Sequence, residues 1–382
     1  MLPHTLRDGG DRMIKIATVF SGIGAIEHAL VRLGWTHEVI FACDNGNIEI
    51  DIDPIKELSH IKKLDGIDSK RDYVKSLYEN KSRKTNFVEK SYKDNYKIKN
   101  ENFFYDVRLL DGIDFRDEID LLVGGSPCQS FSAIGAKAGL EDTRGTLFYD
   151  FARLVKEIKP KVFIYENVYG MLKHDKGNTW EVIHTVFKKL GYYFDYSILD
   201  ARDFGIPQGR RRVFVVGFLI QKDFDNFRFP APISLEYKMS DFLLDNCALG
   251  DFHSSKGEIT LNKSNGIIDD KLFLSEKLKK YVLSPGTKNF FHPNTKIDLD
   301  IARAILSTQG NSHRASVNNY VTTDSRIRAL DPRESLRLMG FTDSFKITVS
   351  KSQSYIQSGN SIVVDVLIHL LRKINIAMTW SE

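Results

Sequence analysis

The sequence contains few cysteines, and it lacks long apolar runs. Cys43, Cys128 and Cys247 are the 3 cysteines in 382 residues, and they lie far apart without the spacing of a metal site. This usage is typical of a reducing compartment and argues against a disulfide framework, and we expect no bound metal. No stretch of 18 or more apolar residues occurs, so we expect no transmembrane helix and a cytoplasmic protein without a membrane partner. Residues 1–12 lack the pattern of a secretory signal and are expected to form a disordered leader.

An excess of charge of one sign is also missing. The chain has 54 Lys and Arg against 50 Asp and Glu, a net charge of +4. Such a mild charge permits an anionic partner without requiring one, so composition alone does not predict nucleic-acid binding. The length suits one large domain, or one domain with a smaller one.

Strands and helices alternate from residue 13 to residue 220. The β-branched "IKIATVF" runs into the helical "SGIGAIEHALVRLG", and later buried-type strands read "EVIFACD", "IDLLVGG", "FIYENV" and "RRVFVVGF". This alternation predicts an α/β fold with a Rossmann-like, doubly wound and mostly parallel sheet.

Two segments interrupt the alternation. Residues 51–102 are rich in Lys, Asn, Asp and Tyr. This composition favours a solvated insertion, with a contact to the DNA backbone as the alternative. Residues 221–327 lose the pattern while their charges balance, which indicates a second, smaller domain. Helical patterning resumes in residues 328–382.

The first glycine turn indicates a cofactor site. "TVFSGIGA" places Gly22 and Gly24 between the first strand and the first helix, whose free N–H groups suit a ligand. The third glycine of G-x-G-x-x-G is replaced by Glu27, so a plain structural turn is the alternative. Asp44 ends the second strand, where such folds bind ribose hydroxyls, and Asp106 follows the next strand. Together they predict a nucleoside-containing cofactor that does not need a pyrophosphate.

Cys128 has the setting of a nucleophile. In "GGSPCQSFSAIG", residues 124–135, it follows the strand "IDLLV" at the edge where doubly wound sheets hold their active sites. The loop is polar and constrained, and a reactive thiolate needs a partner acid or base there. The alternative, a buried apolar cysteine, suits Cys43 in "IFACD" better.

Charged partners for this thiol follow at two later strands. "IYENV" ends with Glu166 and Asn167, and Glu166 is a candidate general acid, with a helix cap as the alternative. "IPQGRRRVFVVGF" begins a strand with three arginines. Strand alternation places Arg210 and Arg212 on one side and Arg211 on the other. They are candidates to hold a carbonyl oxygen or a phosphate, unless they form a solvated face.

Six motifs in this order resemble the DNA (cytosine-5) methyltransferases. They are "FSGIGA", "GGSPCQSFS", "ENV", "QGRRR", "RALDPRESLRLMGF" and "QSGNSIVVDVL", and the resemblance covers residues 13–50, 103–220 and 326–372. Bacterial members paired with restriction endonucleases are the nearest match. The resemblance implies a catalytic and cofactor-binding domain in 13–220, a target-recognition domain in 221–327, and a return of 328–382 to the catalytic domain. It also implies double-stranded DNA with a short specific site as substrate, a monomer, and a functional pairing with a restriction endonuclease.

The resemblance further implies S-adenosylmethionine as cofactor, with S-adenosylhomocysteine as product. Asp44 would bind the ribose in place of the family's usual glutamate, Asp106 would accept from the adenine amino group, and Asn360 would help close the pocket. The implied cofactor residues are Phe20, Ser21, Gly22, Gly24, Asp44, Asp106, Val107 and Asn360.

The same resemblance assigns the catalytic roles. Cys128 would attack C6 of a cytosine flipped out of the duplex, because C5 of the aromatic ring is a poor nucleophile. Glu166 would contact N3 and the exocyclic amine, and Arg212 would hold O2. The implied catalytic residues are Cys128, Glu166, Arg212, Arg210 as a support, and Pro127, which shapes the loop. The glycine- and serine-containing loop 129–146 would close over the base.

Residues that read or hold DNA are expected on the catalytic loop and near the end of the variable segment. The candidates are Gln129, Ser130, Ser132, Asn167, Ser312, His313, Arg314, Asn318 and Asn319. Arg328, Arg333, Glu334 and Arg337 are interpreted as structural.

Three other functions compete with DNA methylation. An RNA (tRNA) cytosine-5 methyltransferase would lack the long variable segment, and a catalytically silent DNA-binding relative would have lost Cys128 or Glu166. A Rossmann oxidoreductase would need the third glycine.

Overall fold

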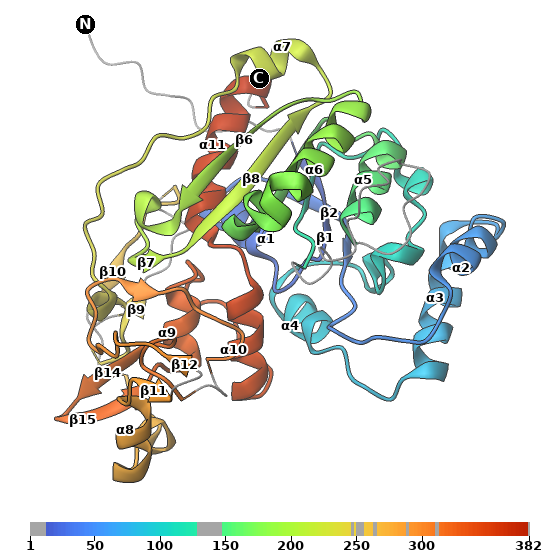
Figure 1. Cartoon of the computed structure of the whole chain (residues 1–382). Helices are drawn as coiled ribbons and strands as arrows, with labels where there is room; N and C mark the ends of the chain where they lie inside the picture. Colours follow the sequence, from blue (N-terminus) through green and yellow to red (C-terminus); the bar gives the residue numbers. More distant parts are fainter. Residues whose placement is uncertain are drawn as a thin grey trace, which may run out of the picture.

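The computed structural model describes residues 13–127, 147–245, 248–249, 256–262, 266–287, 290–309 and 313–380. A seven-stranded sheet forms its centre, with the strand order β3-β2-β1-β4-β5-β8-β6 (Figure 1). The strands are β1 (Ile14–Val19), β2 (His37–Cys43), β3 (Phe103–Phe104), β4 (Leu121–Gly124), β5 (Val162–Val168), β6 (Tyr193–Asp200) and β8 (Arg211–Phe218).

The sheet is mostly parallel. Neighbouring strands from β3 to β5 are parallel, whereas β8 runs antiparallel to both β5 and β6. The predicted doubly wound α/β fold is therefore confirmed. The strand order reverses between β1 and β4, and such a switch point is where sheets of this kind bind ligands. The carboxyl ends of β1 to β5 meet at one edge together with the amino end of β8.

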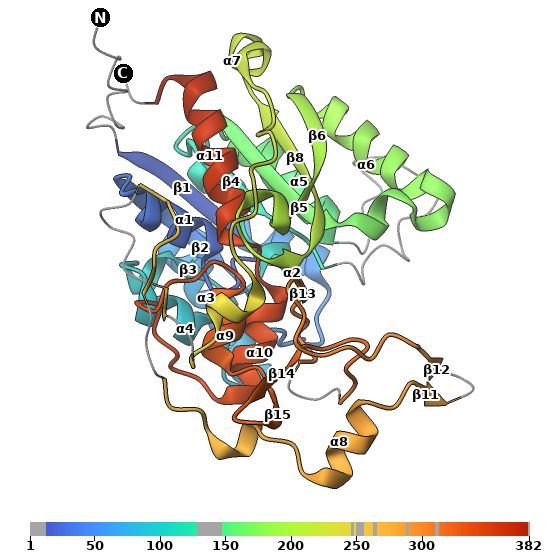
Figure 2. The same cartoon turned by 90° about the vertical axis from the view of Figure 1, so that its left-hand side faces the viewer.

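Helices cover both faces of the sheet (Figure 2). α1 (Ala25–Leu33) and α11 (Val364–Met378) pack on one face, and α5 (Leu147–Ile158) and α6 (Asn178–Lys189) pack on the other. Alternation along β5 divides the two cores, since Val162 and Ile164 face α1 and α11 while Phe163 and Tyr165 face α5 and α6.

The two ends of the described chain meet through a buried ion pair. Arg32 of α1 donates to Asp365 of α11 at 2.8 Å, and both side chains are almost fully buried. Arg32 also donates to the Gly340 carbonyl. Residues 328–380, with α9 (Pro332–Arg337), α10 (Lys351–Asn360) and α11, thus return to the body formed by the first half of the chain.

The insertion after β2 folds into three helices. They are α2 (Pro54–Ile61), α3 (Ile67–Lys81) and α4 (Phe87–Asn95). Asp53 and Asn86 cap α2 and α4 by accepting backbone N–H groups, which supplies the start signals for these helices. Val74 and Tyr78 of α3 pack with Ile48 and Leu109 in a small separate core. α2 and α3 project from one side of the molecule, whereas α4 lies closer to the body (Figure 1).

The main core extends past the expected boundary at residue 220. α7 (Gln221–Asn226) packs on α11 and β8, and Phe227, Met239 and Phe242 are buried in the same cluster as α1. These apolar side chains lie within or after "FRFPAP" without strand or helix periodicity, so the sequence gives no signal of their burial.

The rest of the variable segment has little regular structure. In its described residues, short two-stranded ladders and one α-helix lie below the sheet in Figures 1 and 2. They are β9 (Ala248–Leu249) with β10 (Leu261–Asn262), α8 (Glu276–Val282), β11 (Gly286–Thr287) with β12 (Phe290–Phe291), and β14 (Tyr320–Thr323) with β15 (Arg326–Ala329). β13 (Ala302–Arg303) pairs with β7 (Gln208–Gly209) and so joins this segment to the body. Among the helices in the described part of the chain, none is long and apolar enough to cross a membrane.

Candidate active site

The turn after β1 has a backbone that favours glycine. Phe20, Gly22 and Gly24 have φ angles of 53°, 52° and 76°. The ring of Tyr96 fills the space that a Cβ atom on Gly24 would need, so a side chain there is excluded by both conformation and space. Ser21 ties β1 to β2, because its hydroxyl donates to the Thr18 carbonyl and accepts from the Cys43 N–H at 2.9 Å. This hydroxyl is therefore used within the protein.

Asp44 lies directly against the glycine turn. One carboxylate oxygen accepts from the Gly22 N–H at 2.9 Å, and the other accepts from the Gly46 N–H at 2.8 Å. Burial raises the pKa of Asp44, and these two backbone donors oppose that shift. Cys43, the preceding residue, is buried, and burial raises the pKa of its thiol, as expected for an inert cysteine.

Asp106 lies at the same edge of the sheet. It begins a short 3₁₀ turn with Val107, and it follows β3, which pairs with β2. Its carboxylate accepts from Arg108 Nη2 at 2.7 Å and from the Tyr78 hydroxyl at 2.9 Å. The Asp44 N–H donates to the Phe104 carbonyl at 3.0 Å, so the two acidic positions predicted from the sequence are neighbours in the fold.

The root of the cysteine loop rests on the end of β5. A Cβ atom on Gly125 would lie 2.7 Å from the Glu166 carbonyl and 2.9 Å from a Glu166 carboxylate oxygen, so only glycine lets the loop approach this closely. Ser126 is buried and pairs with the Tyr165 hydroxyl at 2.7 Å, and the exposed Pro127 follows. Cys128 and the predicted Gln129, Ser130 and Ser132 lie outside the described residues.

Asn167 is an internal support of that loop. Its amide donates to the Ser126 carbonyl at 2.9 Å and to the Tyr165 hydroxyl at 3.0 Å, and its oxygen accepts from the Val168 N–H. The side chain is 2% exposed. The predicted DNA contact does not fit Asn167, because both amide hydrogens are bound to protein atoms.

Glu166 and Arg212 face each other from adjacent antiparallel strands. Arg212 Nε lies 3.2 Å from Glu166 Oε1. Burial raises the pKa of Glu166, while the nearby Arg212 and Arg210 cations act in the opposite direction. Arg211 points the other way and lies over the Tyr169 ring at 5.0 Å. The predicted alternation of the three arginines is thus confirmed.

Arg210 is buried and holds two other segments. Its guanidinium donates to the carbonyls of Ile305, Gly359 and Ser361 at 2.7 to 2.8 Å. These bonds bracket the predicted cofactor residue Asn360, which is exposed at the end of α10. A Cβ atom on Gly359 would clash with the Ser307 backbone, which explains a glycine at this position.

The candidates at the end of the variable segment separate into two groups. His313 is exposed, and Arg314 lies over the Tyr281 ring at 5.4 Å. Asn318 and Asn319 are buried, and Asn319 exchanges hydrogen bonds with the backbone of Arg303. The predicted DNA contact therefore does not fit these two asparagines. Ser312 lies outside the described residues.

The arginines of "RALDPRESLRLMGF" are built into the body. Arg328 and Glu334 form a buried bidentate ion pair, in which each guanidinium nitrogen lies 2.8 Å from a carboxylate oxygen. Arg337 pairs with Asp343 at 2.7 Å. Arg333 donates to the Thr342 carbonyl. Their interpretation as structural is confirmed.

Sequence reasoning missed the residues that surround the acidic pair. Tyr78, Asn86, Tyr96 and Arg108 contact Asp106, Asp44 or Gly24, and the first three lie within the segment interpreted as an insertion. Tyrosines and an asparagine in a lysine-rich stretch carry no signal that distinguishes them from surface residues.

A comparison with known families identifies the chain. The family model of C-5 cytosine-specific DNA methylase matches residues 66–375. This chain belongs to that family. C-5 cytosine methylases transfer a methyl group from S-adenosylmethionine to DNA, and the glycine turn and the two acids fit that nucleoside-containing molecule.

Relatives support the same assignment. This methylase is 35% identical to the Type II methyltransferase M.HhaI of Haemophilus parahaemolyticus over 68% of this chain and 77% of the relative. It is 34% identical to the Type II methyltransferase M.NgoBI of Neisseria gonorrhoeae over 95% of this chain and 93% of the relative. The RNA-modifying and catalytically silent alternatives are therefore not favoured.

Solved structures share the fold. The Dnmt2 methyltransferase of S. pombe superimposes with a TM-score of 0.60 at 16% identity, covering 95% of this methylase and 98% of that chain. A DNMT2 mutant of Spodoptera frugiperda gives a TM-score of 0.62 at 16% identity, covering 94% and 99%.

Proposed function

We propose that this methylase modifies one cytosine within a short, specific DNA site and thereby protects host DNA from a restriction endonuclease. The Type II relatives support this assignment, since one of them aligns over 95% of the chain. The observation that carries the catalytic part is the Glu166–Arg212 pair against the root of the cysteine loop. We further propose that the protein acts as a monomer.

Cys128 is proposed as the nucleophile. Gly125, Ser126 and Pro127 bring the chain to the carboxyl edge of β4 beside Glu166, and Cys128 is the next residue. Its thiolate adds to C6 of the flipped cytosine, and the lost aromaticity makes C5 nucleophilic. S-adenosylmethionine supplies an electrophilic methyl group when bound. A base then removes the C5 proton, and the bond between sulfur and C6 breaks.

Glu166 and Arg212 are proposed to stabilise the attacked ring. A raised pKa keeps more of the Glu166 carboxyl protonated near neutral pH, which suits donation to N3. Arg212, on the neighbouring strand, is suited to hold O2 as charge develops there. Asn167 and Arg210 then act by positioning, since Asn167 holds the loop root and Arg210 holds the segment around Asn360.

The cofactor residues are proposed from the same edge of the sheet. Asp44 and Asp106 are placed to bind ribose hydroxyls and the adenine amino group. Phe20, Gly22, Gly24, Val107 and Asn360 would complete the pocket. The Ser21 hydroxyl is already bonded to the backbone of β1 and β2. We therefore propose that Ser21 contributes to the cofactor pocket through its backbone alone.

Target recognition is proposed for the variable segment. Because Phe227 and Phe242 belong to the main core, we narrow the proposed recognition segment to residues 246–327, which joins that core through Ala302, Ile305 and Val321. Within it, Ser312, His313 and Arg314 are the proposed base or phosphate contacts, together with Gln129, Ser130 and Ser132 of the catalytic loop.

Bisulfite sequencing tests the proposed reaction. Purified protein is incubated with a sequence-diverse plasmid, with and without S-adenosylmethionine, beside Cys128→Ser as the matched control. We expect cofactor-dependent protection of cytosines within one short motif, and none with the serine variant, which should still bind S-adenosylhomocysteine. Full conversion with the wild type would refute DNA C5 methylation, and equal protection with Cys128→Ser would refute the nucleophile.

A further inference from the structure

The segment interpreted as a solvated insertion contacts the cofactor edge of the sheet at three separate points. Tyr78 of α3 reaches Asp106, Asn86 at the start of α4 reaches Asp44, and Tyr96 after α4 reaches Gly24. Each contact is a hydrogen bond to a residue that the sequence pattern assigned to the cofactor.

Tyr78 is the most direct of these contacts. Its hydroxyl donates to the Asp106 carboxylate at 2.9 Å, on the oxygen that Arg108 Nη2 also approaches. Its ring is buried in the small core of the insertion beside Val74. A rigid ring thus fixes the direction from which Asp106 receives a hydrogen bond, and a bond to a charged acceptor is stronger than an ordinary one.

Asn86 supports the loop after β2. Its amide donates to the Asp44 carbonyl at 2.8 Å, while its oxygen accepts from the first N–H groups of α4. Gly46 packs against the Asn86 side chain so closely that a Cβ atom would clash. The Gly46 N–H is one of the two donors to the Asp44 carboxylate, so the Asn86 side chain helps to fix the position of this donor.

Tyr96 closes the third contact. Its hydroxyl donates to the Gly24 carbonyl at 2.8 Å and to the Ile23 carbonyl at 3.1 Å, and its ring covers the Gly24 Cα. The conformation of the glycine turn therefore depends on a side chain that is 72 residues away in sequence.

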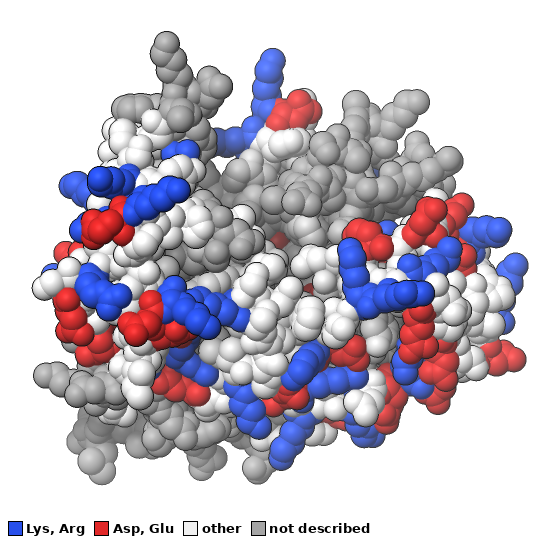
Figure 3. Space-filling model, turned by 90° about the horizontal axis from the view of Figure 1, so that it is seen from below, with Lys and Arg blue, Asp and Glu red and all other residues white. Residues whose placement is uncertain are grey.

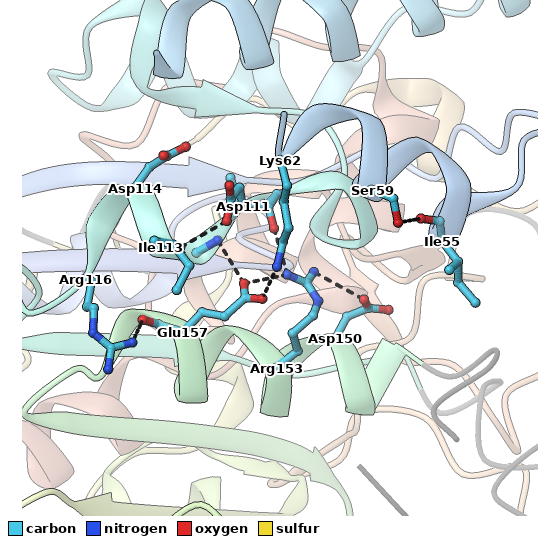
Figure 4. Close-up of polar contacts among 12 residues, drawn as sticks. Ile55, Ser59, Lys62, Asp111, Ile113, Asp114, Arg116, Asp150, Arg153 and Glu157 are labelled. Atoms are coloured by element: carbon cyan, nitrogen blue, oxygen red, sulfur yellow. Dashed lines mark hydrogen bonds and ion pairs between the residues drawn. The ribbon is translucent and has the colours of Figure 1, made fainter. Parts of the chain in front are cut away.

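The insertion is fastened to the body at both of its ends. Lys62 of α2 lies 2.6 Å from Glu157 of α5, beside Arg153 (Figure 4). On α4, the Ser91 hydroxyl donates to Gln357 of α10 at 2.9 Å, and Gln357 donates back to the Phe87 carbonyl. These attachments hold the insertion against the body of the protein at both ends.

Several of its lysines form ion pairs within the protein. Lys90 pairs with Asp94, Lys93 with Glu89, and Lys70 with Asp111 and Asp114. In the view from below, Lys and Arg alternate with Asp and Glu over the side of the molecule where the insertion lies (Figure 3). A surface of mixed sign gives little attraction for a DNA backbone, so the alternative interpretation of this segment is not supported.

We propose that residues 54–98 form an outer wall of the cofactor site, with Tyr78, Asn86 and Tyr96 as positioning residues for Asp106, Asp44 and Gly24. This inference rests on the cofactor roles proposed above. An open pocket of about 220 Å³ borders this wall, and Ile48, Lys75, Tyr78, Asn86, Glu89 and Tyr105 are among the residues that line it, so Tyr78 and Asn86 contact the acids and also border open space.

The test compares two tyrosines of one helix. Tyr78→Phe removes only the hydroxyl that binds Asp106, and Tyr73→Phe is the matched control because the Tyr73 hydroxyl donates to Glu57 within the insertion. We expect Tyr78→Phe to raise the calorimetric Kd for S-adenosylhomocysteine and the KM for S-adenosylmethionine about three- to tenfold, while kcat and the KM for DNA change less than twofold. Tyr73→Phe should change neither cofactor constant. Tyr96→Phe, which keeps the ring over Gly24, should behave like Tyr78→Phe.

Each contrary outcome has its own meaning. If Tyr78→Phe and Tyr96→Phe bind S-adenosylhomocysteine as tightly as Tyr73→Phe does, the inference is wrong and the proposed function stands. If Tyr78→Phe instead raises the KM for DNA and leaves cofactor binding intact, the insertion belongs to the DNA surface and the inference is also wrong. Wild-type protein that binds no S-adenosylhomocysteine would overturn the cofactor assignment itself, and the inference with it.

Discussion

The carboxyl of Glu166 experiences two opposing influences. Burial at the end of β5 favours its neutral form, while Arg212 at 3.2 Å and the nearby Arg210 favour the carboxylate. The pKa is raised, so burial outweighs the two cations. A proton donor to N3 of cytosine needs this balance, because an ordinary glutamate is almost fully ionised at neutral pH.

A change of this single residue should alter the pH profile. Glu166→Gln keeps the size of the side chain and can donate a hydrogen bond, but it cannot transfer a proton, so we expect kcat to fall by about 10²- to 10⁴-fold with unchanged binding of S-adenosylhomocysteine. In the wild type, kcat/KM should decline as pH rises through the raised pKa of Glu166. Methyl transfer from labelled S-adenosylmethionine between pH 5 and 9 measures both. The same decline in Glu166→Gln would show that another group causes it.

Residue type and position predicted the charged groups better than the amides. Glu166 and Arg212 were predictable because a charge beside a buried strand end has few structural uses. Asn167, Asn318 and Asn319 were assigned to DNA, yet all three are buried. An amide side chain can satisfy either a protein backbone or a base edge, and the sequence does not say which partner is present.

At the scale of helices, Glu27 joins α1 to the insertion. It stands where a dinucleotide fingerprint has its third glycine, and its carboxyl is fully buried and accepts from the Tyr92 hydroxyl of α4. Burial raises the pKa of Glu27 to about 7. The departure from the glycine pattern thus reflects a contact with α4, which a sequence motif does not record.

This contact predicts a pH-dependent stability. With its pKa raised from 4.5, Glu27 holds its proton more tightly in the folded state. Its contribution is complete below about pH 4.5 and is lost as pH rises through about 7, a total loss on the order of 3 kcal/mol. Urea unfolding at pH 5.5 and pH 8 should therefore show a smaller decrease in stability for Glu27→Gln than for the wild type. Equal decreases in the two proteins would contradict the raised pKa.

The strands were predictable as elements, while the helices of the insertion and their contacts were not. Runs such as "IDLLV" and "VFVVGF" are buried on both faces of the sheet, and this burial requires the continuous apolar composition that the sequence displays. Helices α3 and α4 bury only two residues each, Val74 and Tyr78 in α3 and Ser91 and Tyr92 in α4, so their composition matches that of a solvated segment. Their contacts with Asp106 and Gly24 depend on tertiary folding alone.

Across the whole molecule, the active edge is assembled from both ends of the chain. Arg32 pairs with Asp365, and Arg210 holds Gly359 and Ser361, so residues 328–380 are part of the same body as β1 to β8. The variable segment lies between these two parts in sequence, and its strand β13 pairs with β7 of the body. An arrangement of this kind allows the segment to change while the catalytic edge is kept.

A pair of chimeras tests this division of the molecule. Replacing residues 246–327 with the matching segment of another Type II methyltransferase leaves Phe227, Met239 and Phe242 in the main core and keeps the buried Arg328–Glu334 pair. We expect this chimera to methylate the donor's site at a comparable rate, as read by bisulfite sequencing. Replacing 221–327 exchanges those core side chains as well, so its melting temperature should be lower than that of the first chimera, because foreign apolar side chains rarely fill an existing core. If the first chimera methylates the original site, target recognition by this segment is refuted. If the two chimeras have equal melting temperatures, the recognition domain begins at residue 221, as predicted from the sequence.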